Sequence, residues 1–408
     1  MVAIAAAVGV LVVALGAGGA WWSWGRGDVA PPAPERAQPL EPLPAGKVSL
    51  AVLPLASPGG DARQVGRELG VRYVLEGSLE TDPERVRVAV QLIDAGTGAQ
   101  IWSERYDRPA GDVFAVRDEL VGQIAGTLLG YGGPVMGDTV ERARLKPPQN
   151  LDAYDYARLA SAAYRETKEG MAEVRALSEK AIALDPDYAR AYFSFAWAHF
   201  TDALQGYSDN PARSLEQFHA AADKMVALDP IDPYAQFMGG LSSFKRGDRA
   251  RGKEAWERAL ALAPNDPSIL RMVGTNMAYA MGTEGAAEGV ELMKRALRLN
   301  PLAPARHLSM LGFASYFAGQ HEQATEALEK SGATSLETKV FKALAYAQLG
   351  RAADAAREVE AILQEKPDFT ARGWIANDIM EPGGSSEALF LDGARKAGLP
   401  IDEPAPTN

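Results

Sequence analysis

The chain has 408 residues, of which 47% are hydrophobic and 23% are charged. These proportions are ordinary for folded proteins, and at roughly 150 residues per domain the length allows two or three domains. The 53 acidic and 42 basic residues give a net charge of −11, which argues against binding along a nucleic-acid backbone. Cysteine is absent, which excludes disulfides, thiolate metal sites and cysteine nucleophiles.

The N-terminal segment is apolar and uncharged from Val2 to Trp22. As a helix rising about 1.5 Å per residue it would reach roughly 31 Å, enough to cross a bilayer core. We expect residues 1–24 to form a transmembrane anchor, since a secretory signal peptide, the alternative, would have a basic start and a shorter apolar core. Six prolines in residues 25–47 predict an extended linker, because proline fixes φ and lacks a backbone donor.

Residues 48–130 are predicted to form a small α/β domain. The apolar run 48–55 predicts a buried strand, and an amphipathic helix is expected over 112–129. Between them, three segments alternate apolar and polar residues, which predicts an antiparallel meander of strands over 71–80, 85–94 and 99–107. The first strand can pair in parallel with the first strand of the meander, because the connection is long enough for a crossover.

The consecutive strand sequences of this domain carry a family resemblance. VGRELGVRYVLEGSLE followed by RVRVAVQLIDAGTGAQIWSERYD resembles the TolB-like N-terminal module of bacterial TPR proteins, over about residues 48–129. In that family the module commonly lies between a membrane span and a TPR array, and a class III adenylate or guanylate cyclase domain or a winged-helix domain often precedes the span. Two features differ: a helix and a strand usual in the family are missing after LPLASPGGD, and the sequence starts at the span. We therefore expect no inherited catalytic activity.

The C-terminal half contains repeats. Proline closes successive units at intervals of 44, 34 and 37 residues, at positions Pro186, Pro230, Pro264 and Pro301. The clearest unit, Pro233–Asp266, resembles the tetratricopeptide repeat (TPR), with small residues and one tryptophan at Gly240, Gly252, Trp256 and Ala259. Such units bury their apolar faces only when they stack. The predicted fold is mainly α: a linker over 131–149, five or six TPR units over 150–367 and capping helices over 368–400.

The sequence offers little catalytic chemistry. Gly247–Glu254 matches the phosphate-loop spacing, but Glu254 stands where Ser or Thr should bind magnesium and no strand precedes it, so a turn between helices is predicted. The four histidines, His199, His219, His307 and His321, lack metal-ligand spacing. We therefore expect no catalytic residue, no cofactor and no metal.

The predicted solenoid suggests a surface for a protein or peptide partner. Aromatic residues are dense between 188 and 200; helical periodicity places most of them in the core and leaves the others for a concave groove. Polar residues of a later inner helix would join this groove. The candidate partner-binding residues are Tyr192, Trp197, Arg271, Thr275 and Asn276.

The resulting hypothesis is a membrane-anchored, non-enzymatic TPR scaffold that binds proteins and not nucleic acid. The family resemblance implies a single-pass protein of the bacterial inner membrane, with its soluble part in the periplasm. Two alternatives share an absent N-terminal domain: a regulatory or sensory tail of an adenylate or guanylate cyclase, or of a winged-helix transcriptional regulator. The sequence GARKAGLP near the end resembles the tails of cyclase-linked relatives.

Overall fold

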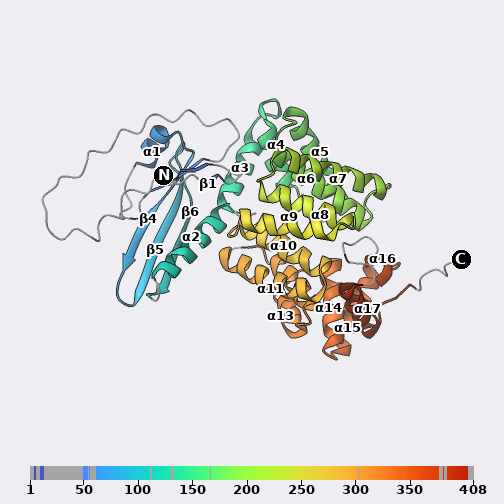
Figure 1. Ribbon diagram of the computed structural model, residues 1–408. Coiled ribbons are helices and arrows are strands. Elements are labelled where there is room, and N and C mark those ends of the chain that lie inside the picture. The colour runs from blue at the N-terminus through green and yellow to red at the C-terminus, as the bar shows by residue number, and fades with distance from the viewer. Residues whose placement is uncertain are drawn as a thin grey trace. The chain divides into compact units, whose positions relative to one another are not determined.

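The computed structural model describes most of the chain after residue 48. The described residues are 4–5, 10–12, 49–53, 55, 61–110, 113–129, 133–165, 167–301, 303–375, 380 and 384–402. They fall into two compact units, Met1–Val121 and Gly122–Asn408. The first unit is built on a sheet and the second is a helical array (Figure 1).

The sheet of the first unit is mixed. Its four main strands are β3 (Leu50–Val52), β4 (Tyr73–Thr81), β5 (Arg85–Asp94) and β6 (Gln100–Pro109). β3 pairs in parallel with β4, and the two later pairings are antiparallel, as predicted. Helix α1 (Ala62–Leu69) lies in the crossover; Asp61 caps its first turn, and Gly70 ends it with a φ of 65°.

Strand β5 shows why the meander could be predicted. Its apolar positions, Val86, Val88, Val90 and Leu92, are all buried, whereas Arg85 and Arg87 on the opposite face are exposed. Successive side chains of a strand point to opposite faces, so this alternation gives the sheet one buried and one polar face.

Among the residues that the structure describes, the predicted transmembrane helix is not found. Of the apolar segment Val2–Trp22, the structure describes two pieces, and both are short strands: β1 (Ile4–Ala5) and β2 (Val10–Val12). β2 pairs in parallel with β3, and β1 pairs with β2. At the described positions of this segment the structure therefore has strands where a helix was expected; apolar residues suit a strand as well as a helix. The rest of this segment and the linker 25–47 lie outside the described residues, and no described helix is long and apolar enough to cross a bilayer.

Two helices precede the repeats. Helix α2 (Val113–Leu129) contains the boundary between the units, and its later residues belong to the helical array. Gly126 of α2 lies close to Leu299 of the array: a Cβ added at Gly126 would lie 2.6 Å from the Leu299 carbonyl oxygen, so a larger residue would not fit there. Residues 131–149 were predicted to be a linker but contain helix α3 (Pro134–Leu145), whose apolar stripe buries Val135, Val140 and Ala143, and a 3₁₀ turn, Pro148–Asn150.

Six helix pairs follow, within the predicted range 150–367. They are α4 (Ala153–Ala162) with α5 (Lys168–Leu184), α6 (Ala189–Gln205) with α7 (Pro211–Leu228), α8 (Pro233–Lys245) with α9 (Arg249–Leu262), α10 (Pro267–Ala280) with α11 (Gly282–Leu299), α12 (Arg306–Phe317) with α13 (His321–Ser331), and α14 (Leu336–Gln348) with α15 (Ala352–Glu365). The pairs stack in chain order (Figure 1). Two further helices, α16 (Ala371–Ile375) and α17 (Ser385–Ala397), occupy the range predicted for the cap.

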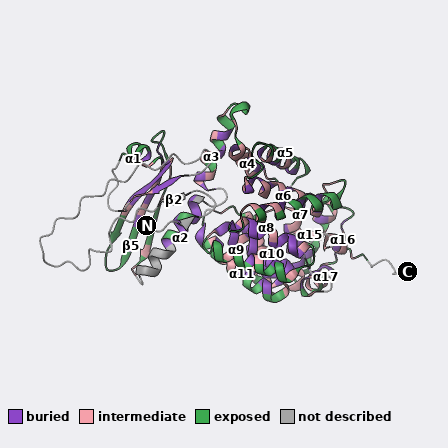
Figure 2. Ribbon diagram, turned by 45° about the horizontal axis from the view of Figure 1, so that its top comes forward, coloured by how far each residue is buried: buried purple, intermediate pink, exposed green. Residues whose placement is uncertain are grey.

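Small residues let the two helices of a pair approach closely. A Cβ added to Gly240 of α8 would lie 2.4 Å from Cδ1 of Trp256 on α9. Trp256 is 1% exposed and donates from Nε1 to the Phe237 carbonyl at 3.1 Å, while Ala259 is fully buried. Buried residues line the helix surfaces that face other helices (Figure 2). The chain therefore forms a mainly α, TPR-like helical array preceded by a small mixed sheet.

Candidate partner-binding face

The first helices of the pairs contact one another along the array. Helices α6, α8, α10 and α12 are neighbours in this order, and we call their shared surface the inner face. Sequence signals set the starts of α8 and α10: Asp232 and Asp266 cap their first turns, and a proline occupies the first helical position of each. Side chains at equivalent positions of these helices therefore lie next to one another across repeats.

Aromatic residues occupy the first part of the inner face. Phe193 and Trp197 of α6 stack with ring centroids 6.5 Å apart and an interplanar angle of 9°. Phe193 meets Tyr234 of α8 edge-on at 5.5 Å, and Trp197 lies 6.2 Å from Phe237. Phe193 and Trp197 remain half-buried, whereas Phe200 of the same helix is in the core. Periodicity was expected to place most of the aromatic residues between 188 and 200 in the core, but only Phe200 is buried and the others are half-buried.

Tyr192, another candidate residue, contacts the turn that precedes its own helix. Its hydroxyl donates a hydrogen bond to the Pro186 carbonyl at 2.9 Å, in the turn that precedes α6. Burial, with smaller contributions from Asp187 and Asp185, raises the pKa of this phenol. The structure thus ties Tyr192 to the turn between repeats, while Trp197 lies among the aromatic rings of the inner face.

A chain of polar contacts links three successive inner helices. The Arg190 guanidinium of α6 lies 3.6 Å from the ring centroid of Tyr234 on α8, and its Nη1 lies 3.5 Å from the Asp232 carboxylate. The Tyr234 hydroxyl donates to Oδ2 of Asp266, the cap of α10, at 2.9 Å. Asp232 is buried, whereas Arg190, Tyr234 and Asp266 are half-buried, so water screens these contacts only in part and they connect successive repeats. Periodicity alone did not predict this chain of contacts.

The three polar candidates share helix α10. The Asn276 amide donates to the Met272 carbonyl of its own helix at 2.8 Å, and the Thr275 hydroxyl contacts Met293 Sδ at 3.4 Å. Arg271 Nη1 reaches Met310 Sδ of α12 at 3.4 Å. All three candidates are half-buried. The structure therefore groups Arg271, Thr275 and Asn276 on one helix and places Trp197 on the inner face two repeats earlier.

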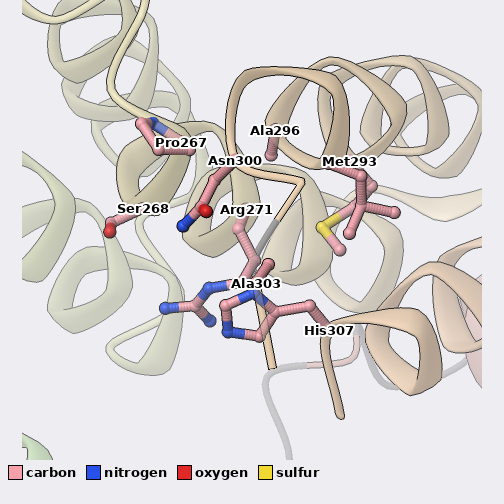
Figure 3. Close-up of a pocket in the computed structure, with 9 residues that line it drawn as sticks. Pro267, Ser268, Arg271, Met293, Ala296, Asn300, Ala303 and His307 are labelled. Atoms are coloured by element: carbon pink, nitrogen blue, oxygen red, sulfur yellow. The ribbon is translucent and has the colours of Figure 1, made fainter. Parts of the chain in front are cut away.

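A small hollow lies beside Arg271 (Figure 3). It has room for about one water molecule and lies among the N-terminal residues of α10 and α12 and the last turns of α11. Its nine lining residues are Pro267, Ser268, Arg271, Met293, Ala296, Leu297, Asn300, Ala303 and His307. Figure 3 shows the Arg271 guanidinium and the His307 imidazole together at one side of the hollow.

His307 is the residue that the sequence reasoning did not connect with this face. It is 6% exposed, and its Nε2 atom is buried without a hydrogen-bond partner. Burial, together with the charges of Arg271 and Arg306, lowers its pKa to about 3, so the imidazole is neutral near pH 7. The sequence positions could have suggested the pairing, because Arg271 and His307 both lie near the N-terminal ends of successive inner helices.

The segment Gly247–Glu254, which matches the phosphate-loop spacing, begins in a turn between two helices. Gly247, with a φ of 83°, lies in the turn between α8 and α9, where Asp248 caps the second helix. Lys253 lies 3.7 Å from Glu257 on the same helix. Within the part of the chain that the structure describes, no three histidine or acidic side chains are placed to hold a metal ion.

Comparisons with known proteins bear on part of the chain. No protein-family model matches it. Over 183 residues, 45% of the chain, it is 32% identical to "Putative adenylate cyclase 3" of Rhizobium meliloti (strain 1021). The match covers 31% of that protein, so this chain spans about a third of the length of this curated relative.

The array also has likenesses among solved structures. The APC/C Cut9–Hcn1 heterotetramer has a TM-score of 0.41 at 16% identity, covering 69% of this chain and 49% of that one. Pseudomonas aeruginosa pilF has a TM-score of 0.36 at 14% identity, covering 55% and 95%. The TPR protein YrrB has a TM-score of 0.31 at 18% identity, covering 53% and 97%. Over part of its length the chain is thus distantly related to the Rhizobium meliloti protein.

Proposed function

We propose that the chain is a non-enzymatic scaffold that binds a segment of a partner protein along the inner face. The main support for this proposal is that Phe193, Trp197 and Arg271 are partly exposed on this face, beside neighbours that are fully buried. Aromatic and arginine side chains dominate protein interfaces, because they combine a large contact area with a polar group. The fixed spacing of the inner helices supports this reading, since a rigid face loses little entropy on binding.

The test uses the full chain as bait for proteins of its own host, with bound partners identified by mass spectrometry. Arg271→Glu should weaken capture, because a truncated or reversed contact in the centre of an interface typically costs about 2 kcal/mol or more. Arg258→Glu, at an exposed position of α9, is the matched control and should leave capture unchanged. Arg87→Glu, on the polar face of β5, tests the sheet unit. If Arg87→Glu abolished capture while Arg271→Glu did not, the partner would bind the sheet unit and not the inner face.

The relationship to the Rhizobium meliloti protein favours a second candidate, a regulatory region of a cyclase signalling system. In this function the partner of the array is a class III cyclase catalytic domain, and this chain forms no cyclic nucleotide by itself. Purified full chain should therefore produce no cAMP from ATP, but should change the rate of an added cyclase domain. Cyclic-nucleotide formation by the chain alone would contradict both candidates.

We further propose that residues 48–129 are a TolB-like module and that the N-terminal segment attaches the protein to the bacterial inner membrane, with the folded units in the periplasm. The strand sequences support the first point and the uncharged run Val2–Trp22 supports the second. Protease added to spheroplasts should degrade the folded units of a periplasmic protein and leave those of a cytoplasmic one intact.

A further inference from the structure

Strand β6 forms one edge of the sheet, because its one neighbour among the described strands is β5. The Ala110 amide, just beyond β6, donates to the Glu84 carbonyl at 2.7 Å, so the backbone of residue 110 faces the preceding strand. In an antiparallel ladder the N–H and C=O groups of alternate residues point to the same side. The backbone groups of Ser103, Arg105 and Asp107 therefore point away from β5, toward the edge.

Two observations agree with an open edge. Pro109 lies at the next outward position, and proline, which has no N–H, is confined in sheets largely to such edge positions. The Asp107 carbonyl accepts from Nη1 of Arg108 at 3.2 Å, which is a side chain and not a neighbouring strand. A row of outward donors and acceptors is a template on which another strand can pair.

The charges of β6 favour one occupant of this edge, a second copy of the same strand. They are arranged in opposite pairs about Tyr106: Arg105 precedes it and Asp107 follows it. Glu104 and Arg108 come next on the two sides. A second β6, antiparallel about a two-fold axis at Tyr106, places Arg105 opposite Asp107. It also places Glu104 opposite Arg108, and the symmetry doubles both pairs.

Other registers lack this complementarity. Moving the axis by one residue to either side places Arg105 or Asp107 opposite its own copy, and like charges directly opposite are unfavourable. Asp107 already pairs with Arg85 and Arg87 of its own sheet, at 2.7 and 3.6 Å. A carboxylate has about four acceptor sites, so it can hold a further guanidinium as well.

We propose that the chain forms a homodimer in which two β6 strands pair antiparallel about Tyr106 and join the two sheets into one. Arg105 of each copy would exchange both backbone N–H···O bonds with Asp107 of the other, because the backbone groups of both residues point outward. Ion pairs at exposed sites add little affinity each, so the charges chiefly fix the register. This inference is independent of the partner proposed for the inner face.

The test is the dimer dissociation constant of the purified full chain, measured by sedimentation velocity over a concentration series. Arg105→Glu should raise it about tenfold or more, because like charges then face each other in two symmetry-related pairs. The reversal should leave the sheet intact, since within one copy Arg105 lies across from Ala89. Arg67→Glu, at an exposed position of α1, is the matched control and should leave the constant unchanged.

Two further variants test the register. Glu104→Lys places a lysine opposite Arg108, and Arg108→Glu places two glutamates opposite each other, so each variant alone should dimerise weakly. In an equimolar mixture every charge again faces its opposite, which should restore association close to that of the wild type. Restoration would also show that both variants are folded, and far-UV circular dichroism checks the fold of each one separately.

Three results would overturn the proposal. The first is a wild-type chain that remains monomeric over the whole concentration series. The second is a dimer whose dissociation constant is the same for Arg105→Glu and Arg67→Glu, which would place the interface elsewhere. The third is a mixture of folded Glu104→Lys and Arg108→Glu chains that associates no more tightly than either variant alone, which would exclude this register.

Discussion

Two histidines, His307 in the core and the half-buried His199, connect the stability of the array to pH. Burial is the main cause that lowers the pKa of His307 to about 3 and that of His199 to about 4, both from an ordinary value of 6.5. The unfolded chain therefore binds more protons than the folded chain between these values, and the free energy of unfolding decreases as pH falls below about 6.5.

Urea unfolding measured between pH 7 and pH 4 should show this decrease. Each histidine contributes a slope of at most about 1.4 kcal/mol per pH unit well inside the window. Replacement of His307 by Gln should flatten the dependence, because the amide does not titrate. The same slope in the wild type and in a variant lacking both His199 and His307 would show that other groups control the acid response.

The contact between α10 and α11 depends on two glycines. A Cβ added to Gly289 would lie 2.3 Å from the carbonyl oxygen of Gly274, and backbone atoms on both sides leave little room to adjust. Gly289→Ala should therefore lower the free energy of unfolding by about 1–3 kcal/mol.

The matched control is Gly137→Ala on α3, where a Cβ meets nothing within 4 Å. This substitution should stabilise the chain by up to about 1 kcal/mol, because alanine favours helix more than glycine does. Chemical denaturation of both variants provides the measurement. If the two substitutions changed the free energy of unfolding by the same amount, the contact between α10 and α11 would accommodate the added methyl group without loss of stability.

At the scale of elements, α17 closes the array by contacts with several earlier helices. The Ser386 hydroxyl donates to the Ala278 carbonyl at 3.1 Å, the Tyr316 hydroxyl to the Leu389 carbonyl at 2.9 Å, and the Gln348 amide to Asp392 at 2.9 Å. The final helix thus joins residues of α10, α12 and α14. Its burial of Phe390 and Ala394 seals the apolar end of the solenoid.

Tyr316→Phe should loosen this helix. The variant removes the hydroxyl that donates to the Leu389 carbonyl, which should lower stability by about 1 kcal/mol and increase hydrogen exchange in α17. Tyr192→Phe provides a matched control, because its hydroxyl also donates to a carbonyl but lies at an exposed site. Equal exchange of α17 in wild type and Tyr316→Phe would show that apolar packing alone holds the helix.

At the scale of the whole molecule, the N-terminal segment should determine how the protein fractionates. If Val2–Trp22 inserts into a bilayer, its roughly 20 apolar residues make the attachment effectively irreversible. The full chain should then remain in the membrane pellet after carbonate washing, while a chain starting at Val48 should appear in the supernatant. Release of the full chain by carbonate would contradict a membrane anchor.

Local patterns in the sequence determined much of this protein. The alternation along β5 and the small residues Gly240 and Ala259 each predicted the observed structure. These signals act over one strand, one helix turn or one repeat, so neighbouring residues carry the required information. The apolar N-terminal run was different, because hydrophobicity without periodicity does not distinguish a helix from a strand.

Only the tertiary structure decided which residues share a site. Arg271 and His307 are neighbours because stacking brings the first turns of α10 and α12 to the same hollow. Ser386 reaches the Ala278 carbonyl across 108 residues of sequence. Such contacts depend on the angle and spacing at which helix pairs stack, and many sequences with the same period would stack differently. The repeats could therefore be read from the amino-acid sequence, whereas the hollow that they enclose could not.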